Sequence, residues 1–426
     1  GVIFNDDPEC YIKHFKPMPL TNDHVNKCIE CGFCEVNCVT CGLTLSSRQR
    51  IVVQRELSRL RATGEDPARL KRLEKQFIYY GNETCAGDGL CSTSCPMKIN
   101  VGEMIHDLRA ERLPKGSLGY KIGDYAANNL QRVEKALRPV LTAAGSLQTF
   151  VGDSGVRSIG KAMHKLGLPQ WTPALPGAHY SGKHTLKCSK KKVVYFPSCI
   201  NQTMGAAKTD AVKVDLVDKM VDLLQKAGWE VVFPEGMSNL CCGTIWESKG
   251  MPDIADRKTY ELEEALLKAS KEGKYPIMCD QSPCLHRMKE KMTKVTVLEA
   301  AEFLHDYVVA DLDITPIDEP VAVHITCSTR KMGIADKIIA LARMCSKRVI
   351  VPEEVGCCGF AGDKGFTHPE VNRWALRKLS QQLEVAGVKR GFSNSRTCEI
   401  GLCTNTGVPY QSIAFLLDEC SKPKKK

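Results

Sequence analysis

Apolar residues recur at helical spacing in the first part of the chain. They do so over residues 46–63 (SSRQRIVVQRELSRLRAT) and over residues 101–112 (VGEMIHDLRAER). Residues three and four apart fall on one face of a helix, so this spacing predicts two helices, each with one buried side. We therefore predict an all-α first domain over residues 1–114.

A bridge is predicted over residues 115–191. Its first stretch, YAANNLQRVEKALRPVL, again has helical spacing, whereas the later GLPQWTPALPGAHYSGKHTLK is rich in glycine, proline and lysine. That composition is typical of an extended linker.

The rest of the chain is an internal repeat, which is visible once its two Cys-Cys-Gly triplets are aligned. In each copy, apolar runs of strand length alternate with helical stretches: KKVVYF, WEVVFP and YPIM in the first copy, and PVAVHI, RVIVP and KRGFS in the second. This alternation predicts parallel strands linked by crossover helices. The expected fold is therefore α/β with an all-α N-terminal part, the two repeated α/β domains covering residues 192–312 and 313–426.

Charge and hydropathy limit the choice of partners. The net charge of +10 is spread along the chain and aromatic residues make up only 6% of it, which does not favour a nucleic-acid partner. No run reaches the roughly 18 apolar residues of a membrane span, and the first residues lack the order of a signal peptide. We expect an intracellular, reducing compartment on the cytoplasmic or matrix side, with any contact to an energy-transducing membrane being peripheral.

The chain contains 22 cysteines, an unusually large number, and their spacing indicates what they do. Repeated spacings of two and two adjacent Cys-Cys pairs suit converging thiolates better than the disulfides of a short secreted scaffold. The first run has the C-x2-C-x2-C-x3-C pattern that wraps a cubane iron–sulfur cluster. The second run has the same spacing before Pro96, but Asp88 stands in place of its second cysteine. The cysteines of the two runs are Cys28, Cys31, Cys34 and Cys38, then Cys85, Cys91 and Cys95.

The fourth cysteine of such a run usually serves the other cluster of a pair. We therefore expect two ferredoxin-type [4Fe-4S] clusters, the first held by Cys28, Cys31, Cys34 and Cys95, the second by Cys38, Cys85 and Cys91 with Asp88 as candidate fourth ligand. A carboxylate is a harder ligand than a thiolate, so the second site would hold a three-iron cluster or a four-iron cluster of altered potential. Equally open is that Asp88 only shapes the AGDGL turn. Two zinc sites are the alternative for the whole set, but structural zinc usually pairs two C-x2-C knuckles.

Each repeat also offers four cysteines, enough for a further cluster in one or both copies. They follow the predicted strands, and parallel strands joined by right-handed crossovers all end at the same edge of their sheet. Residues distant in sequence should thus converge there: Cys199, Cys241, Cys242 and Cys284 in the first copy, Cys327, Cys357, Cys358 and Cys398 in the second.

These repeats resemble the cysteine-rich CCG domains of heterodisulfide reductases and of the iron–sulfur subunits of anaerobic glycerol-3-phosphate and glycolate dehydrogenases. Those families end each repeat with C-x2-C. Here Gln281 and Ser395 replace the leading cysteine of that pair. The departure argues against the five-cysteine noncubane cluster of the disulfide reductases.

A closer resemblance spans essentially the whole chain. It is to the C-terminal iron–sulfur region of FAD-dependent D-lactate and D-2-hydroxyacid dehydrogenases, and it is carried by GVIFNDDP, KCIECGFCEVNC, TLSSRQRIVVQREL, TCAGDGLC, CCGTIWESKG, CCGFAGDKGF and SNSRTCEIGL. In that family a flavin domain precedes this region, so Gly1 would fall about where it ends. The resemblance implies FAD on a partner domain or subunit and a quinone or another electron acceptor.

The resulting hypothesis is that this chain is the electron-transfer portion of an oxidoreductase, with no catalytic residue of its own. The alternative is reductase chemistry at a CCG-bound cluster, as in the heterodisulfide reductase and anaerobic dehydrogenase families. A third possibility is a docking platform that holds zinc or no metal.

Three more residues have two interpretations each. Arg48 and Arg50 follow the first cysteine run and could raise a cluster potential, although a solvated helix face is the default expectation. His324 could ligate a metal or donate to a cluster sulfur, but a histidine satisfied within the core is the commoner case.

Overall fold

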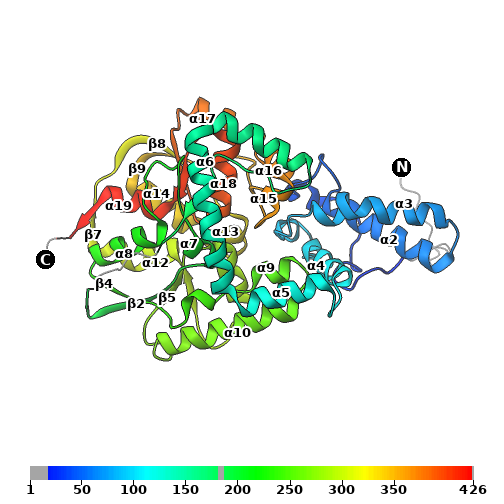
Figure 1. The fold of residues 1–426 in the computed structure, drawn as a ribbon, viewed down its shortest axis with the longest axis horizontal. Coiled ribbons are helices and arrows are strands. Elements are labelled where there is room, and N and C mark those ends of the chain that lie inside the picture. The colour runs from blue at the N-terminus through cyan, green and yellow to red at the C-terminus, as the bar shows by residue number, and fades with distance from the viewer. Residues whose placement is uncertain (1–17, 181–186, 425–426) are drawn as a thin grey trace, which may run out of the picture.

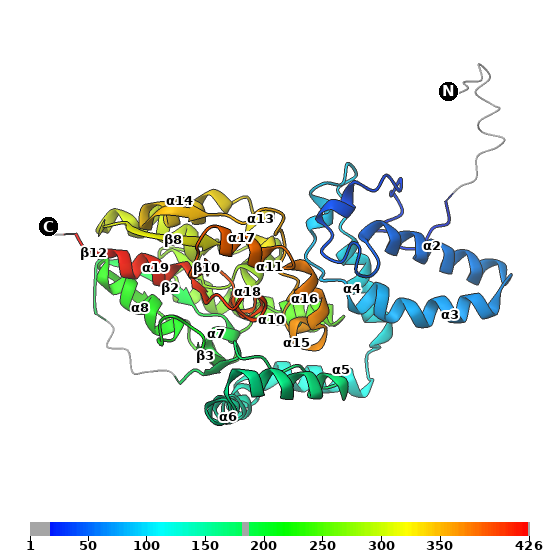
Figure 2. The same ribbon diagram turned by 90° about the horizontal axis from the view of Figure 1, so that it is seen from above.

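The N-terminal part is helical, in agreement with the sequence. The computed structural model describes residues 18–180 and 187–424, and the stretch GVIFNDDP at residues 1–8 lies outside them. Two of the helices, α2 (Ser47–Thr63) and α3 (Pro67–Phe77), lie side by side and project from the rest of the molecule, while α4 (Val101–Arg112) lies nearer the C-terminal part (Figures 1 and 2).

The ends of α2 follow from its sequence. Ser46 caps the helix by accepting a hydrogen bond from the Gln49 amide (3.2 Å), and the Gln49 side chain accepts one from the Ser46 amide (2.8 Å). At the other end Gly64 adopts a left-handed conformation (φ 68°), which ends the helix. The apolar face of α2 packs on α4 in a small core that includes Ile51, Leu57, Met104 and Ile105, and the two cysteine runs lie against this core.

The bridge contains more structure than predicted. Helix α5 (Leu118–Asn128) is followed by α6 (Leu130–Lys165), whose backbone leaves the helical conformation at Gly152 (φ 66°, ψ 174°), and both helices lie along one side of the C-terminal part (Figure 2). The expected extended linker is packed, not free, over much of its length. Trp171 and Ala174 are buried, and β1 (Pro176–Ala178) pairs antiparallel with β3 (Met204–Ala207). These residues have both apolar and strand partners, so the extended stretch is packed against the C-terminal part.

Two parallel four-stranded sheets confirm the duplicated α/β architecture. The first contains β2 (Lys191–Phe196), β4 (Trp229–Val232), β5 (Ile277–Cys279) and β6 (Val297–Glu299), in the order β4-β2-β5-β6. The second contains β8 (Ile317–Val323), β9 (Ser346–Ile350), β10 (Arg390–Ser393) and β11 (Tyr410–Ser412), in the order β11-β10-β8-β9. The two sheets have the same topology. Counted along the chain, the first strand of each copy lies between the second and the third, and the fourth strand lies at the edge beside the third. The fourth strands, β6 and β11, were not predicted.

Helices of both copies surround these sheets (Figure 1). The first copy has α7 (Cys199–Thr203), α8 (Leu216–Lys226), α9 (Thr244–Ser248), α10 (Pro252–Ala269), α11 (Ser282–Lys291) and α12 (Ala300–Phe303). The second has α13 (Cys327–Lys331), α14 (Ala335–Cys345), α15 (Lys364–Thr367), α16 (Pro369–Ala375), α17 (Leu379–Val385), α18 (Arg396–Thr406) and α19 (Ile413–Cys420). An antiparallel pair, β7 (Leu312–Ile314) and β12 (Ser421–Pro423), lies near the C-terminus. Among the described residues, none of the helices combines the length and apolar character needed to span a bilayer.

The two copies share one apolar core between their sheets. Because side chains alternate along a strand, Val193 of β2 and Val321 of β8 lie in that common core. The intervening positions face outward into a separate core of each copy, with Phe196 in the first copy's core and Ala322 in the second's. This alternation decides which side chains reach each copy's cysteines.

A polar seam also joins the copies, at the two positions where cysteine was replaced. The Gln281 side chain donates to the Ser395 hydroxyl (3.0 Å) and accepts from the Arg396 amide (3.0 Å). Gln281 and Ser395 are buried. These side chains therefore tie one repeat to the other, which accounts for the departure from C-x2-C.

We expect Gln281→Ala to destabilise the C-terminal part by about 2 kcal/mol, because it leaves the buried Arg396 amide without a partner and leaves the Ser395 hydroxyl only Thr397 (3.2 Å). Gln76→Ala is the matched control, since Gln76 is exposed on α3 and such surface changes stay within about 0.5 kcal/mol. Anaerobic urea unfolding of both variants measures the difference. Equal midpoints would show that the seam does not contribute to stability.

Candidate metal centres

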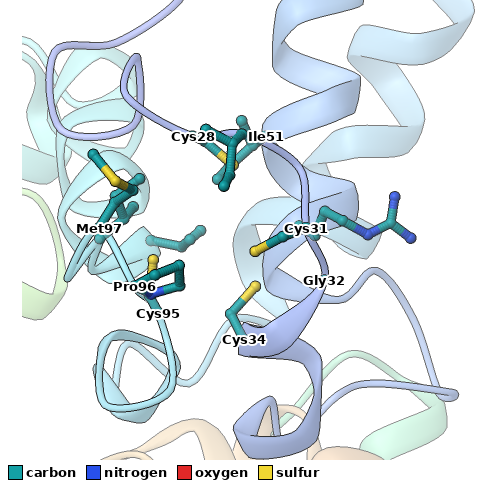
Figure 3. Close-up of a pocket in the computed structure, with 12 residues that line it drawn as sticks. Cys28, Cys31, Gly32, Cys34, Ile51, Cys95, Pro96 and Met97 are labelled. Carbon is teal, nitrogen blue, oxygen red and sulfur yellow. The ribbon is translucent and has the colours of Figure 1, made fainter. Parts of the chain in front are cut away.

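The first pocket brings together the four cysteines expected for the first cluster. It has a volume of about 370 Å³ and is lined by Cys28, Cys31, Cys34 and Cys95, with Ile51, Pro96 and Met97 among its apolar residues. Figure 3 shows the sulfur atom of Cys31 pointing across the pocket toward Cys95, and the sulfur atom of Cys34 pointing toward that of Cys31. Four converging thiols among apolar side chains are the donor set that an iron–sulfur cluster requires.

Three groups near this pocket favour thiolates over thiols. Burial raises the pKa of the Cys28 thiol, but the Glu30 amide, which donates to its Sγ (3.4 Å), and the Arg55 guanidinium both oppose that rise. Arg55 is held in place because it donates to the Cys28 carbonyl (2.9 Å). The pKa of Cys34 is also raised by burial, and the Ser47 hydroxyl opposes this. Metal binding removes the thiol protons, so these donors would stabilise the bound state.

The second pocket contains the remaining members of the ferredoxin-type pattern. Its volume is about 320 Å³, and its lining includes Cys38, Cys85, Cys91, Asp88 and Arg50. Cys91 is buried, and burial raises the pKa of its thiol, with Asp88 and Cys85 adding to the rise. Three thiols and one carboxyl group that the sequence assigned to one cluster therefore line the same pocket.

Arg50 was expected on a solvated helix face, and that expectation was wrong. The side chain is only 1% exposed. Its guanidinium donates to the Gly81 carbonyl (2.7 Å) and the Thr40 hydroxyl (3.0 Å), and Nη1 lies 3.7 Å from Cys38 Sγ. The helical period of α2 carries this arginine to the buried face, where backbone and hydroxyl acceptors satisfy it. Arg48 stays partly exposed, pairs with Glu35 (3.1 Å) and lines the first pocket.

The two carboxylate oxygens of Asp88 correspond to the two roles considered for it, shaping the turn and binding metal. Oδ1 accepts from the Leu90 amide (3.1 Å) and so shapes the turn. Oδ2 is buried and makes no hydrogen bond to any described residue. Burial raises the pKa of this carboxyl group, whereas Cys357 and Lys331 of the second repeat lower it. An unpartnered buried oxygen beside three thiols fits a metal ligand.

The four cysteines of the first repeat form a contiguous set. Cys199 begins α7 directly after β2, and its Sγ lies 4.0 Å from that of Cys241. Hydrogen bonds from Cys241 and Cys284 lower the pKa of the Cys242 thiol well below its usual value. Thus all four thiols meet at the carboxyl edge of the sheet, and Cys242 lies in their middle.

The second repeat has the same arrangement at its own sheet edge. Cys327 begins α13, and its thiol contacts that of Cys357, which in turn contacts Cys358. Cys358 and Cys398 have their Sγ atoms 3.2 Å apart. One difference from the first repeat is that Asp88 raises the pKa values of Cys327 and Cys357 by adding negative charge beside them.

The glycine of each Cys-Cys-Gly triplet is required by the backbone. Gly243 has φ 88°, and a Cβ there would lie 2.2 Å from the Ala255 carbonyl oxygen. Gly359 has φ 72°, and its Cβ would lie 2.9 Å from the Val371 carbonyl oxygen. Only glycine accepts this conformation and this approach, so it lets the chain turn between the two thiols and the next helix.

Known protein families share these features. A 4Fe-4S dicluster domain matches residues 24–99, and a cysteine-rich domain, CCG, matches residues 193–289 and again 321–402. The chain is an iron–sulfur protein. Lactate utilization protein A of Oceanobacillus iheyensis is 23% identical to this iron–sulfur protein over 210 residues, 45% of this chain and 80% of that one. A solved structure of a hypothetical protein from Helicobacter pylori covers 90% of this chain and 69% of its own at 10% identity, but its TM-score of 0.48 is too low to support an argument.

We expect Arg50→Gln to lower the reduction potential at the second pocket. A unit charge at about 6 Å and an effective dielectric of about 20 is worth about 3 kcal/mol, or about 130 mV for one electron. Arg50→Lys keeps the charge and should shift the potential much less. Redox titration followed by paramagnetic resonance measures both variants. An equal fall in the two would assign the effect to the hydrogen bonds and contradict the role of charge.

Asp88→Asn keeps the acceptor for the Leu90 amide but removes the anionic ligand. We expect this variant to lose one iron from the second cluster, while Asp88→Cys gives a four-iron cluster with an altered spectrum. Iron analysis and paramagnetic resonance report both changes. Asp66→Asn is the control, because Asp66 also accepts a backbone hydrogen bond but caps the distant helix α3. Wild-type spectra in both Asp88 variants would limit this residue to shaping the turn.

Proposed function

We propose that this iron–sulfur protein is the electron-transfer part of a flavin-dependent D-2-hydroxyacid dehydrogenase of the D-lactate type. It would take electrons from FAD on a partner domain or subunit and pass them to a quinone or another acceptor. The observation that carries the proposal is the position of Asp88, which lines the second pocket and lies beside Cys357 of the second repeat.

Electrostatic interactions link the candidate centres in order. The charge of Cys38 in the second pocket acts on Cys34 of the first pocket and on Cys91 of its own pocket. Asp88 acts in turn on Cys91 and on Cys357 of the second repeat. This order would let electrons pass from the first pocket through the second to the second repeat.

Positive groups surround the middle of this series. Arg109 donates to the Cys85 carbonyl (3.0 Å), and the Lys364 ammonium group contacts the Glu83 carbonyl. Burial, with a further contribution from the nearby Arg109, lowers the pKa of Lys364 to about 8. Together with Arg50, these cations would favour the extra negative charge of a reduced centre.

Sequence similarity supports the substrate and the partner named in this proposal. The motifs quoted above resemble FAD-dependent D-lactate and D-2-hydroxyacid dehydrogenases, and the matched protein from Oceanobacillus iheyensis is named for lactate utilization. When bound on a partner, FAD supplies the two-electron oxidation of the hydroxy acid and the release of single electrons. This chain would supply the ligands, burial and charges that set the potentials of the relay.

The proposed relay predicts which cysteines are needed for the chain to reduce its electron acceptor. Full-length chain is loaded anaerobically with iron and sulfide, reduced with photoreduced FAD and mixed with a short-chain quinone. We expect Cys357→Ser to slow reoxidation by at least about tenfold while both ferredoxin-type clusters are still reduced. The control is Cys188→Ser, because Cys188 is an exposed free cysteine, and it should behave as wild type.

Two results would contradict this proposal. One is wild-type reoxidation in Cys357→Ser. The other is turnover of a small disulfide by the loaded chain when an artificial electron donor replaces flavin, which would place reductase chemistry at a repeat instead.

A further inference from the structure

The backbone amide and carbonyl of His324 are both held by β10, the neighbouring strand in the sheet. His324 follows β8, its amide donates to the Phe392 carbonyl (2.9 Å), and its carbonyl accepts from the Ser393 hydroxyl (3.4 Å). By the alternation of the strand, its side chain lies on the same side as Ala322, whose outward core also contains Cys358 and Cys398. The fold therefore directs the imidazole toward the thiols.

The imidazole is buried without being satisfied. Its exposure is 2%, and Nε2 makes no hydrogen bond to any described residue. The common case of a core histidine with its polar atoms paired does not hold here. Burial lowers the pKa of His324 to about 3, so the ring is neutral and one nitrogen carries a lone pair.

Two thiols lie within reach of that ring. A ring nitrogen of His324 and the sulfur atoms of Cys358 and Cys398 all lie within 4.8 Å of one another. A neutral imidazole and two thiols at this separation are donors suited to iron or zinc. A metal ion in the space among these three atoms would bind that ring nitrogen, and the ring also has an unpaired Nε2.

The first repeat has no such donor. His324 lies three residues before Cys327, and the residue three before Cys199 is Phe196, buried in the core that contains Cys241, Cys242 and Cys284. The two thiol sets are otherwise alike in number and order. They differ in that the second adds an imidazole where the first has a benzene ring.

We propose that His324 is a metal ligand: its Nε2 coordinates iron beside Cys358 and Cys398 in the second repeat. This inference rests on the proposed function, because it assumes an iron–sulfur cluster in the second thiol set. A neutral nitrogen ligand that takes the place of one thiolate reduces the negative charge of the ligand set and raises the potential of the cluster. The second repeat is then a better electron acceptor than the first, which suits its place next to Asp88.

The test uses the full chain, purified anaerobically and loaded with iron and sulfide, with histidine at natural abundance or labelled with nitrogen-15. Pulsed paramagnetic resonance of the reduced chain should show a strong nitrogen coupling that changes with the label. His324→Phe, which copies the first repeat, should lose that coupling and lower one potential. His286→Phe is the control, because His286 lies two residues from Cys284 but pairs with Glu290 (3.3 Å).

The comparison of the two isotopes uses the unchanged chain, so it shows whether a histidine nitrogen binds the cluster even if His324→Phe fails to fold. One outcome overturns the ligand role of His324 and leaves the relay intact. In it, Cys398→Ala removes a cluster signal, but the unchanged chain shows only a weak nitrogen coupling. If Cys398→Ala removes neither iron nor signal, the second set holds no cluster, and both this inference and the relay through that set fail.

Discussion

The direction in which parallel strands end controls how this protein can gather its thiols. In each repeat the first three strands deliver their following loops to one edge of the sheet, where a cysteine begins a helix and a Cys-Cys-Gly turn meets it. No single loop could bring together four thiols that are spread as widely along the chain as Cys199 and Cys284. If a strand were reversed, its cysteine would lie at the opposite edge, and the donor set would be incomplete.

The same architecture explains how two similar repeats come to differ. They share a core between their sheets and are joined by the Gln281 seam, so neither can change its orientation independently. Their outward faces meet different environments. The second repeat faces Asp88 of the dicluster domain and contains His324, whereas the first has Phe196 at the matching position. We infer that duplication supplied two frameworks, and that local substitutions gave the second one its connection to the relay.

Much of this could be predicted from sequence, because spacing reports on local geometry. Helical periodicity located α2 and α4 within a residue of their observed ends, and the Cys-Cys-Gly repeat predicted both parallel sheets. The short strands β6 and β11 were missed because three apolar residues give no periodic signal. Arg50 and the buried linker around Trp171 were misjudged for a different reason. Their burial depends on acceptors and partners far away in sequence, such as Gly81 for Arg50, and composition cannot reveal those. His324 was noted, but only the structure shows its nitrogen to be unpaired.

The central claim is that these converging thiols hold iron and sulfide for electron transfer. Analysis of iron, zinc and acid-labile sulfide in the anaerobically purified chain, together with paramagnetic resonance of its reduced form, tests it most directly. The account predicts iron and sulfide in equal amounts, little zinc, and signals from more than one interacting cluster. A chain that contains zinc without sulfide, or no metal at all, and that gives no signal on reduction would contradict it.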